Sequence, residues 1–550
     1  MTLATESTTE PTGSTSPRAG VTIRVSTLAW AAGVLIFLLL RIGPVWRAPV
    51  SGAELIHLSG AWQAHLGIGD SRFLPTLSQA ITALTFHWTI SEVPARIIAF
   101  AATATIPGAI YLLRPRLGEA GALLALLLLA FDAPGLLLGS QASALGFDLP
   151  LSLWLFALMT RRSNWLWASP LAAFLVAVSG PLSLPLVFGW AAVRLWRRDY
   201  PRPRRAAMTA AAALLGVVVS SFRFGLGWDH LVVAPLRLFA DGYDQVWSTA
   251  TVTDTFLVYA WPLLVASAIA LGVAVPRRWP IRGLDLHDRL LGAWAFASFA
   301  WALSSSQSHT IVPLVALTTP CAIFLGPLLA RGIGAMVHAD WISARFLIPA
   351  CGFLGLLAIA IAINWARLGY APTSQRVFLV LLIALMGVGV ASVAALPPAR
   401  PALVACGAAA LLPLFAGTMG VALSVNEAPL VSPVSTTQAR ELRDIVLQVA
   451  ADQHGLVVVH SSFTDDVTWP FRDSGSLVVA TRIPADAVVA VWPAELPKPD
   501  GMDPLEGDWA LVNEVDQPSS SFLAYLHWLI DRRSVTTSPS QVAVYVRTQQ

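Results

Sequence analysis

The chain has 550 residues, of which 56% are apolar and only 12% are charged, and its mean hydropathy is +0.66. These values exclude a soluble globular protein of this size, since such proteins are about 45–50% apolar and about 25% charged. The formal net charge is only +3, and the three cysteines all fall inside apolar stretches, so neither a disulfide framework nor a thiolate metal cluster is expected. The composition indicates a polytopic membrane protein.

Many apolar stretches approach the length that a membrane-crossing helix needs, which is about 20 residues for a hydrocarbon core of about 30 Å. They lie near residues 26 to 45, 93 to 113, 118 to 137, 142 to 160, 164 to 179, 181 to 196, 206 to 226, 255 to 275, 289 to 304, 310 to 330, 344 to 364, 376 to 396 and 401 to 424. We therefore predict an all-α polytopic membrane bundle of about 13 transmembrane helices over residues 26–424.

Arginine gathers at the ends of alternate stretches, with the densest run at residues 194–205. Because basic residues stay on the cytoplasmic side of short loops, this alternation predicts an inner N-terminus. Residues 1–25, rich in Ser, Thr and Pro, then form a disordered cytoplasmic tail, and residues 425–550 lie outside the cytoplasmic membrane. The basic charge on the inner rim indicates membrane orientation and no nucleic-acid binding.

Two outer loops are long, at residues 43–92 and 227–254, and long loops usually carry function. In the first loop, residues 53–66 and 73–86 repeat apolar residues at helical spacing, which predicts two amphipathic helices on the outer membrane surface. The second loop alternates aromatic and charged residues. We expect the two loops to wall a cavity at the outer interface.

The segment 425–550 has a different pattern from the rest of the chain. Residues 437–453 place Leu442, Ile445, Val446 and Val449 on one helical face, and short apolar runs after them are typical of strands. These runs are LVVVH, SLVVAT, AVVAVW, WALVNE and VAVYVR, with a second helix, SFLAYLHWLIDRR, before the last. The alternation predicts a small α/β extracytoplasmic C-terminal domain.

These features together resemble the GT-C superfamily of membrane glycosyltransferases, which includes the protein mannosyltransferases and the aminoarabinose lipid A transferases. The family carries an acidic pair, typically Asp-Glu, at the start of the first outer loop; the matching segment here is Gly52-Ala53-Glu54-Leu55, with Ala53 in place of the first acid. Weaker matches are the acids in FDAPG and ALGFDLPLSLW, the segment WPFRD at 469–473 and the closing RRSVTTSPSQVAVYVR.

The resemblance implies transfer of a sugar from a polyprenyl-phosphate donor to an envelope lipid, glycan or protein, with membrane lipids as surroundings and the acceptor unknown. Such chemistry needs a carboxylate base, and Glu54 is the first candidate, followed by Asp148 and Asp132. The leaving phosphate needs a cation, for which Arg223 and then Arg237 are candidates. His57, next to the acidic segment, is a further substrate-binding candidate. We expect no cofactor and no metal.

Each candidate also has a simpler structural interpretation. Glu54 suits the N-terminus of a helix through the macrodipole alone, which is worth about 0.3–1 kcal/mol. The position of Arg223 is also typical of an arginine whose side chain only extends to the outer headgroups. Asp132 begins the sequence Asp-Ala-Pro-Gly, which is typical of a turn. Asp148 lies inside an apolar stretch, where an acid is costly, so a functional role is favoured for it.

Two other functions remain open from the sequence. A secondary transporter or flippase component would also have about a dozen spans, but it would usually show internal repeats and charges at mid-membrane, and we find no convincing repeat. A non-catalytic GT-C-like scaffold or lipid-binding protein fits the alanine at position 53. Fold alone does not separate these functions.

Overall fold

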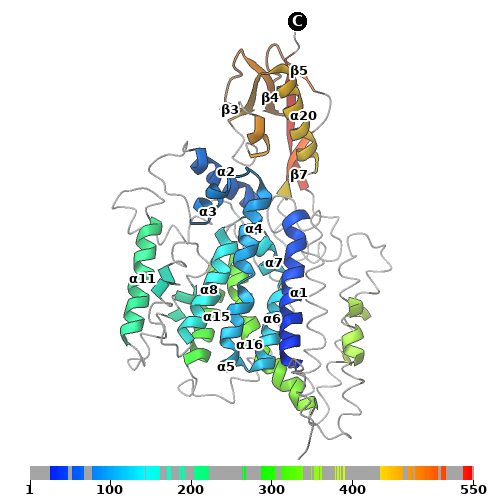
Figure 1. Ribbon diagram of the computed structural model, residues 1–550. Coiled ribbons are helices and arrows are strands. Elements are labelled where there is room, and N and C mark those ends of the chain that lie inside the picture. The colour runs from blue at the N-terminus through cyan, green and yellow to red at the C-terminus, as the bar shows by residue number, and fades with distance from the viewer. Residues whose placement is uncertain are drawn as a thin grey trace, which may run out of the picture.

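The computed structural model describes part of the chain in detail. The described segments are residues 25–47, 52–66, 77–140, 144–160, 203–221, 286–304, 311–337, 434–435, 437–461, 469–474, 477–505, 509–515 and 537–547, with residue 142 and scattered positions in 170–193, 263–267 and 349–389. A helical bundle forms the body of the protein and a small domain built on a sheet stands at one end of it (Figure 1). The predicted stretches near 164–179, 181–196, 255–275, 344–364, 376–396 and 401–424 fall wholly or largely outside these segments.

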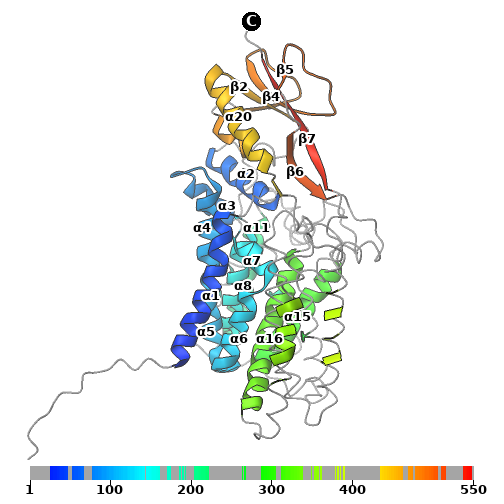
Figure 2. The same cartoon turned by 90° about the vertical axis from the view of Figure 1, so that its right-hand side faces the viewer.

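The bundle is built from the N-terminal half of the chain and two later helices (Figure 2). Its helices are α1 (Val25–Arg47), α4 (Glu92–Thr103), α5 (Ile106–Leu117), α6 (Glu119–Ala130), α7 (Ala133–Ser140), α8 (Ala144–Thr160), α11 (Pro203–Ser221), α15 (Leu286–Ser304) and α16 (Ile311–Val337). Among the residues that the structure describes, three helical stretches are long and apolar enough to cross a membrane, namely Val25–Trp46, Glu92–Leu117 and Val315–Gly334, and shorter apolar helices such as Gly146–Thr160 accompany them. The chain is therefore a membrane protein with a mostly helical fold.

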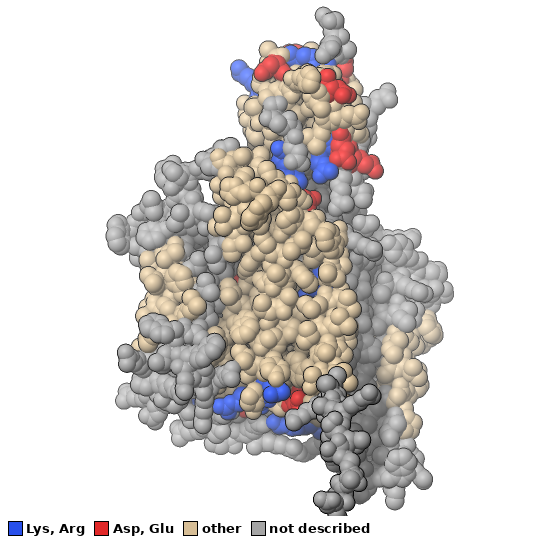
Figure 3. Space-filling model, in the orientation of Figure 1, with Lys and Arg blue, Asp and Glu red and all other residues tan. Residues whose placement is uncertain are grey.

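The outer surface of the bundle carries apolar side chains. On α1, Leu35, Leu39 and Trp46 are exposed although all three are large and apolar. Figure 3 shows a broad zone with few charged side chains between a charged lower rim and the charged C-terminal domain. A soluble protein rarely exposes so large an apolar surface, and lipid contact explains it.

Helices α6 and α16 pack closely because small residues line their contact. A Cβ atom at Gly121 would lie 2.9 Å from the Pro327 Cα, closer than side-chain atoms normally approach. Buried residues of both helices, among them Leu126, Leu129, Ala322 and Leu325, belong to one apolar core. This contact fixes α16 against the N-terminal helices.

Two of the predicted stretches each contain a break in the helix. The stretch near 93–113 divides into α4 and α5, because Pro107 has no amide hydrogen for the carbonyl of Thr103 and its ring crowds that carbonyl. The stretch near 118–137 divides into α6 and α7 at Phe131 and Asp132. The second break places an acidic side chain inside the bundle.

The first loop forms α2 (Gly52–Leu66) and α3 (Leu77–Thr85), which lie between the bundle and the C-terminal domain (Figures 1 and 2). Helix α2 agrees with the prediction, and α3 lies within the predicted 73–86, of which residues 73–76 are outside the described segments. Leu58 and Ala61 of α2 are completely buried in a cluster that includes Trp469 of the C-terminal domain, so α2 packs against protein, and its place on the outer membrane surface stays a prediction. The loop is therefore a packed layer between two larger parts.

The C-terminal domain combines one long helix with a mixed sheet. Its elements are β1 (Val434–Ser435), α20 (Thr437–Gln453), β2 (Leu456–His460), the 3₁₀ helix η5 (Trp469–Ser474), β3 (Leu477–Ala480), β4 (Ala487–Pro493), β5 (Asp503–Pro504), β6 (Trp509–Val515) and β7 (Thr537–Val546). The order is β1-β6-β7-β4-β2-β3, with β5 beside β7. Strand β2 is parallel to β3 and β4, and the other pairs are antiparallel.

Alternation along the strands separates two apolar clusters in this domain. One cluster joins Leu442 and Val446 of α20 to Val457 and Val489 of the sheet, together with Phe471 of η5. The other includes Val458, Ala490 and Trp492, which point to the opposite face. The predicted helix 437–453 and strand 456–460 are thus confirmed, while the predicted second helix, at 521–533, lies outside the described segments.

Candidate functional site

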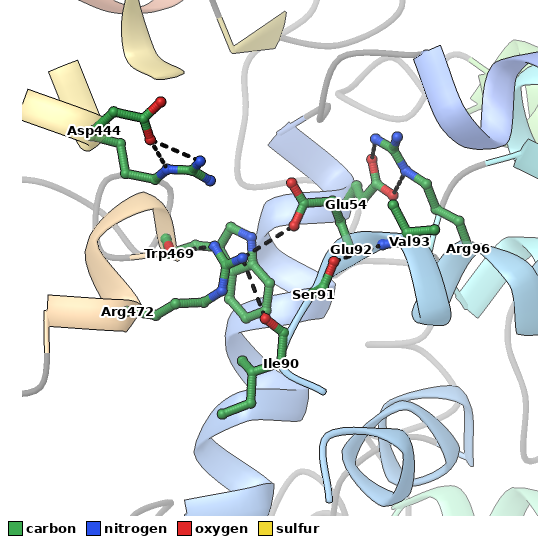
Figure 4. Close-up of polar contacts among 10 residues, drawn as sticks. Glu54, Ile90, Ser91, Glu92, Val93, Arg96, Asp444, Trp469 and Arg472 are labelled. Atoms are coloured by element: carbon green, nitrogen blue, oxygen red, sulfur yellow. Dashed lines mark hydrogen bonds and ion pairs between the residues drawn. The ribbon is translucent and has the colours of Figure 1, made fainter. Parts of the chain in front are cut away.

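Glu54 forms a buried ion pair with an arginine that lies 42 positions away in the chain. Arg96 donates from Nε to Oε1 and from Nη2 to Oε2, both at 2.6 Å (Figure 4). The amide of Ala142 donates to Oε1 at 2.9 Å. The side chains of Glu54 and Arg96 are 0% and 2% exposed. Two parallel N–H···O bonds of this kind hold the carboxylate in one orientation and place a positive charge beside it.

The ion pair joins four separate parts of the fold. Glu54 lies in the first turn of α2 and Arg96 in α4, while Ala142 precedes α8. Arg96 also donates from Nη1 to the carbonyl of Val45, near the end of α1, at 3.3 Å. Removing one member would leave the other as an uncompensated buried charge, which typically costs about 3–5 kcal/mol.

An apolar cluster joins the helices that carry the pair to the C-terminal domain. It contains Leu58 and Ala61 of α2, Phe86 and Ala95 beside and within α4, Ala142, and Trp469 of η5. The rings of Phe86 and Trp469 have centroids 5.7 Å apart. A residue of the C-terminal domain therefore shares a cluster with Ala142, whose amide donates to Glu54.

His57 connects the two helices of the first loop. Its Nε2 lies 3.2 Å from the hydroxyl oxygen of Thr82 in α3, and the ring is 6% exposed. Burial lowers the pKa of His57 to about 4, so the ring is neutral at physiological pH. Its contacts explain how α3 is held on α2, and the substrate-binding role remains a prediction.

Asp132 lies in a second polar cluster inside the bundle. Its Oδ2 accepts from the Thr318 hydroxyl of α16 at 3.0 Å and from the Gly135 amide at 3.2 Å, so the side chain caps α7. Its Oδ1 has no hydrogen-bond partner among the residues that the structure describes, although Asp132 is only 1% exposed. An ionisable group so deep in a membrane bundle usually has a function.

Arg41 of α1 contributes the positive charge near this aspartate. Its Nη2 donates to the Leu129 carbonyl at 2.9 Å and its Nη1 to the Ala130 carbonyl at 3.4 Å, which caps the end of α6. The guanidinium lies 3.7 Å from the centroid of the Phe37 ring. Cation–π contact and helix capping together make a buried arginine tolerable here.

The other predicted site residues differ in what the structure describes. Asp148 lies in α8 and is completely buried, and its carbonyl accepts from the Ser152 hydroxyl at 2.7 Å. Arg223 and Arg237 lie outside the described segments. In the part of the chain that is described, no group of three or more His, Cys, Asp or Glu side chains is placed to hold a metal ion.

Sequence reasoning missed both buried arginines. Neither Arg41 nor Arg96 is among the site residues expected from the sequence, although both are almost completely buried. The available signal was the position of Arg41 inside a long apolar helix, where an arginine needs a partner. For Arg96, the signal was its place one turn after Glu92 on the same helix face.

No protein-family model matches the sequence, and no curated protein matches it significantly. Solved structures do match the fold. The crystal structure of ArnT from Cupriavidus metallidurans bound to undecaprenyl phosphate superposes with a TM-score of 0.54 at 13% identity, covering 95% of this chain and 99% of that chain. The structure of the same protein in the apo state gives a TM-score of 0.53 at 14% identity, with the same coverage. At this level of identity, the likeness shows that the chain shares the overall fold of these ArnT structures.

Proposed function

We propose that the protein transfers a sugar from a polyprenyl-phosphate donor to an envelope acceptor at the outer face of the cytoplasmic membrane. The observation that carries the proposal is the likeness over nearly the whole chain to a structure that was solved with undecaprenyl phosphate. The proposal includes the predicted orientation, in which the C-terminal domain and the first loop are extracytoplasmic. A lipid-borne donor also suits a chain in which we identified no nucleotide-binding motif.

Glu54 is the proposed base for the acceptor. Arg96 and the Ala142 amide hold its two carboxylate oxygens in place through hydrogen bonds. These donors also take up most of the hydrogen bonds that the Glu54 carboxylate can accept, since a carboxylate offers about four lone-pair positions. An acceptor hydroxyl must therefore displace one of the donors or approach a lone pair that they leave.

The remaining acids and arginines take supporting roles in the proposal. Asp132 and Asp148 are further acidic candidates, and His57 is a substrate-binding candidate. Arg223 and Arg237 are proposed to pair with the phosphate of the donor, because a guanidinium binds phosphate oxygens through two parallel hydrogen bonds.

A second candidate function is a GT-C-like protein that binds the lipid phosphate without transferring a sugar. The specific observation in its favour is the engagement of both Glu54 oxygens by Arg96, together with alanine at position 53. In this candidate, Glu54 serves as a structural partner of Arg96. Both candidates predict a bound polyprenyl phosphate, and only the first predicts loss of transfer when Glu54 alone is changed.

Native mass spectrometry of the protein extracted from its own membranes tests the lipid. A co-purifying polyprenyl phosphate, or its glycosylated form, is expected in the wild type and in Arg443→Ala, and it should be lost in Arg223→Ala. Arg443 is a suitable control because it lies on α20 and pairs with the neighbouring Asp444 at 2.9 Å, on the surface. Ordinary phospholipids alone in all three proteins would refute both candidates.

A transfer assay separates the two candidates. Reconstituted wild-type protein should transfer the sugar of the donor identified in this way, while Glu54→Gln should retain the donor and lose transfer. Retention of full transfer by Glu54→Gln would remove the base role from this residue.

A further inference from the structure

Four charged side chains of alternating sign run from the first loop into the C-terminal domain. Glu54 of α2 pairs with Arg96 of α4, and Glu92 at the start of α4 pairs with Arg472 of η5 at 3.2 Å (Figure 4). The Glu92 and Arg472 side chains are 20% and 5% exposed, so this second pair is also largely shielded from water. The sequence places Glu92 and Arg472 380 positions apart.

Arg472 is held in place by several contacts besides Glu92. Its guanidinium lies over the Trp469 ring, 4.1 Å from the centroid, and it donates to the carbonyls of Trp469 at 3.0 Å and Ile90 at 3.4 Å. Trp469 is 2% exposed in the apolar cluster that also holds Leu58 and Ala61 of α2. The C-terminal domain is therefore docked through Trp469 even without the charge of Arg472.

Glu92 has two possible partners in this arrangement. Arg96 follows it by four residues on the same helix, and the two charges interact. An acid that precedes a base by four residues is the favourable order for a helical ion pair. In the structure, Glu92 instead accepts a hydrogen bond from Arg472. Arg96 donates from Nε and Nη2 to the two carboxylate oxygens of Glu54.

We propose that Arg472 is a positioning residue for Glu54. By holding Glu92, Arg472 keeps it from competing for Arg96, and Arg96 then holds Glu54 through two hydrogen bonds. Without Arg472, Glu92 turns to Arg96, and Glu54 loses part of its restraint. The importance of this arrangement rests on the function proposed above for Glu54, but its test does not, because the test involves no transfer.

The amide of Ala142 reports the position of Glu54, since it donates directly to Oε1 at 2.9 Å. Its exchange with deuterium, measured by mass spectrometry on the full chain in nanodiscs, is the readout. Arg472→Gln should accelerate this exchange about tenfold or more, because a hydrogen bond to a charged group is weakened. Adding Glu92→Gln to Arg472→Gln removes the competitor and should return the exchange to within about threefold of wild type.

Two controls keep the result specific. Arg443→Gln makes the same chemical change on the surface of α20 and should leave the Ala142 exchange unchanged. The amide of Val458 in β2 reports whether the C-terminal domain remains folded. Should Arg472→Gln unfold this domain, Glu92→Gln alone replaces it as the test and should leave Ala142 exchange at the wild-type rate.

Several outcomes would overturn the proposal. Unchanged Ala142 exchange in folded Arg472→Gln would show that Arg472 does not act on Glu54. Equally fast exchange in Arg472→Gln and in the double variant would show that loss of docking, and not competition by Glu92, is responsible. Faster exchange in Glu92→Gln alone would lead to the same conclusion. None of these results would affect the sugar-transfer proposal, which Glu54→Gln tests separately.

Discussion

Changing Glu54 and Arg96 singly and together gives the sharpest test of their buried ion pair. Glu54→Gln leaves Arg96 as a buried charge without its carboxylate, and Arg96→Met does the converse. Both side chains are almost completely buried, at 0% and 2% exposure, so each single change should lower the free energy of unfolding by about 3–5 kcal/mol. The double variant removes both charges and should recover most of this loss.

The matched control is an exposed ion pair of the same protein. Arg114 and Glu119 lie 3.6 Å apart at the α5–α6 connection, with side chains 41% and 50% exposed. Glu119→Gln makes the same chemical change as Glu54→Gln, but an exposed pair contributes only about 0–1 kcal/mol. The contrast between the two variants isolates the effect of burial.

The assay is reversible unfolding in mixed micelles, followed by tryptophan fluorescence. A loss of 3–5 kcal/mol corresponds to a change of roughly 10²- to 10³-fold or more in the unfolding equilibrium, which this assay resolves. If Glu54→Gln costs no more than Glu119→Gln, the buried pair does not stabilise the fold as argued. If the double variant is as unstable as the two single changes combined, the two residues act independently, and the reasoning also fails.

Three further predictions concern other parts of the molecule. Burial lowers the pKa of His57 from 6.5 to about 4, so the unfolded chain binds more protons than the folded chain between these pH values. The contribution of the neutral, buried ring to the free energy of unfolding is full above pH 6.5 and is lost as pH falls toward 4. Replacing His57 with Gln should remove up to about 3 kcal/mol of this pH dependence in unfolding titrations. A cysteine introduced at exposed Ala451 should react with an impermeant thiol reagent in intact cells, and one at exposed Ala120 should not; the reverse pattern would refute the predicted orientation. Gly121→Val should separate α6 from α16 and lower the thermal midpoint, because even a Cβ atom would lie 2.9 Å from the Pro327 Cα; an unchanged midpoint would contradict this packing.

Much of the fold can be predicted from the sequence because its signals are local. The helix at 437–453 follows from the spacing of Leu442 and Val446, and both are buried against the sheet as expected. The membrane-crossing stretch Val25–Trp46 follows from a continuous apolar run. The two-residue strands β1 and β5 carry no comparable signal, because so short a segment has no periodicity.

The site is less accessible to sequence reasoning because its contacts are long-range. The first outer loop and Glu54 can be singled out from the chain, but the partner Arg96 is 42 positions away and Ala142 is 88 positions away. Trp469 and Arg472 belong to a segment that the family resemblance had marked only weakly. Their positions depend on how the C-terminal domain packs on α2, and no local pattern encodes that packing.

The separation of Glu92 and Arg472 has a consequence for biosynthesis. At roughly 5–20 residues per second, a ribosome needs about 20 to 80 s to add the 380 positions between the two side chains. Throughout that interval Glu92 lacks Arg472, and the basic side chain beside it on the same helix is Arg96. The loop around Glu54 therefore reaches its final set of ion pairs only when the segment with Arg472, 380 positions later in the chain, has been translated.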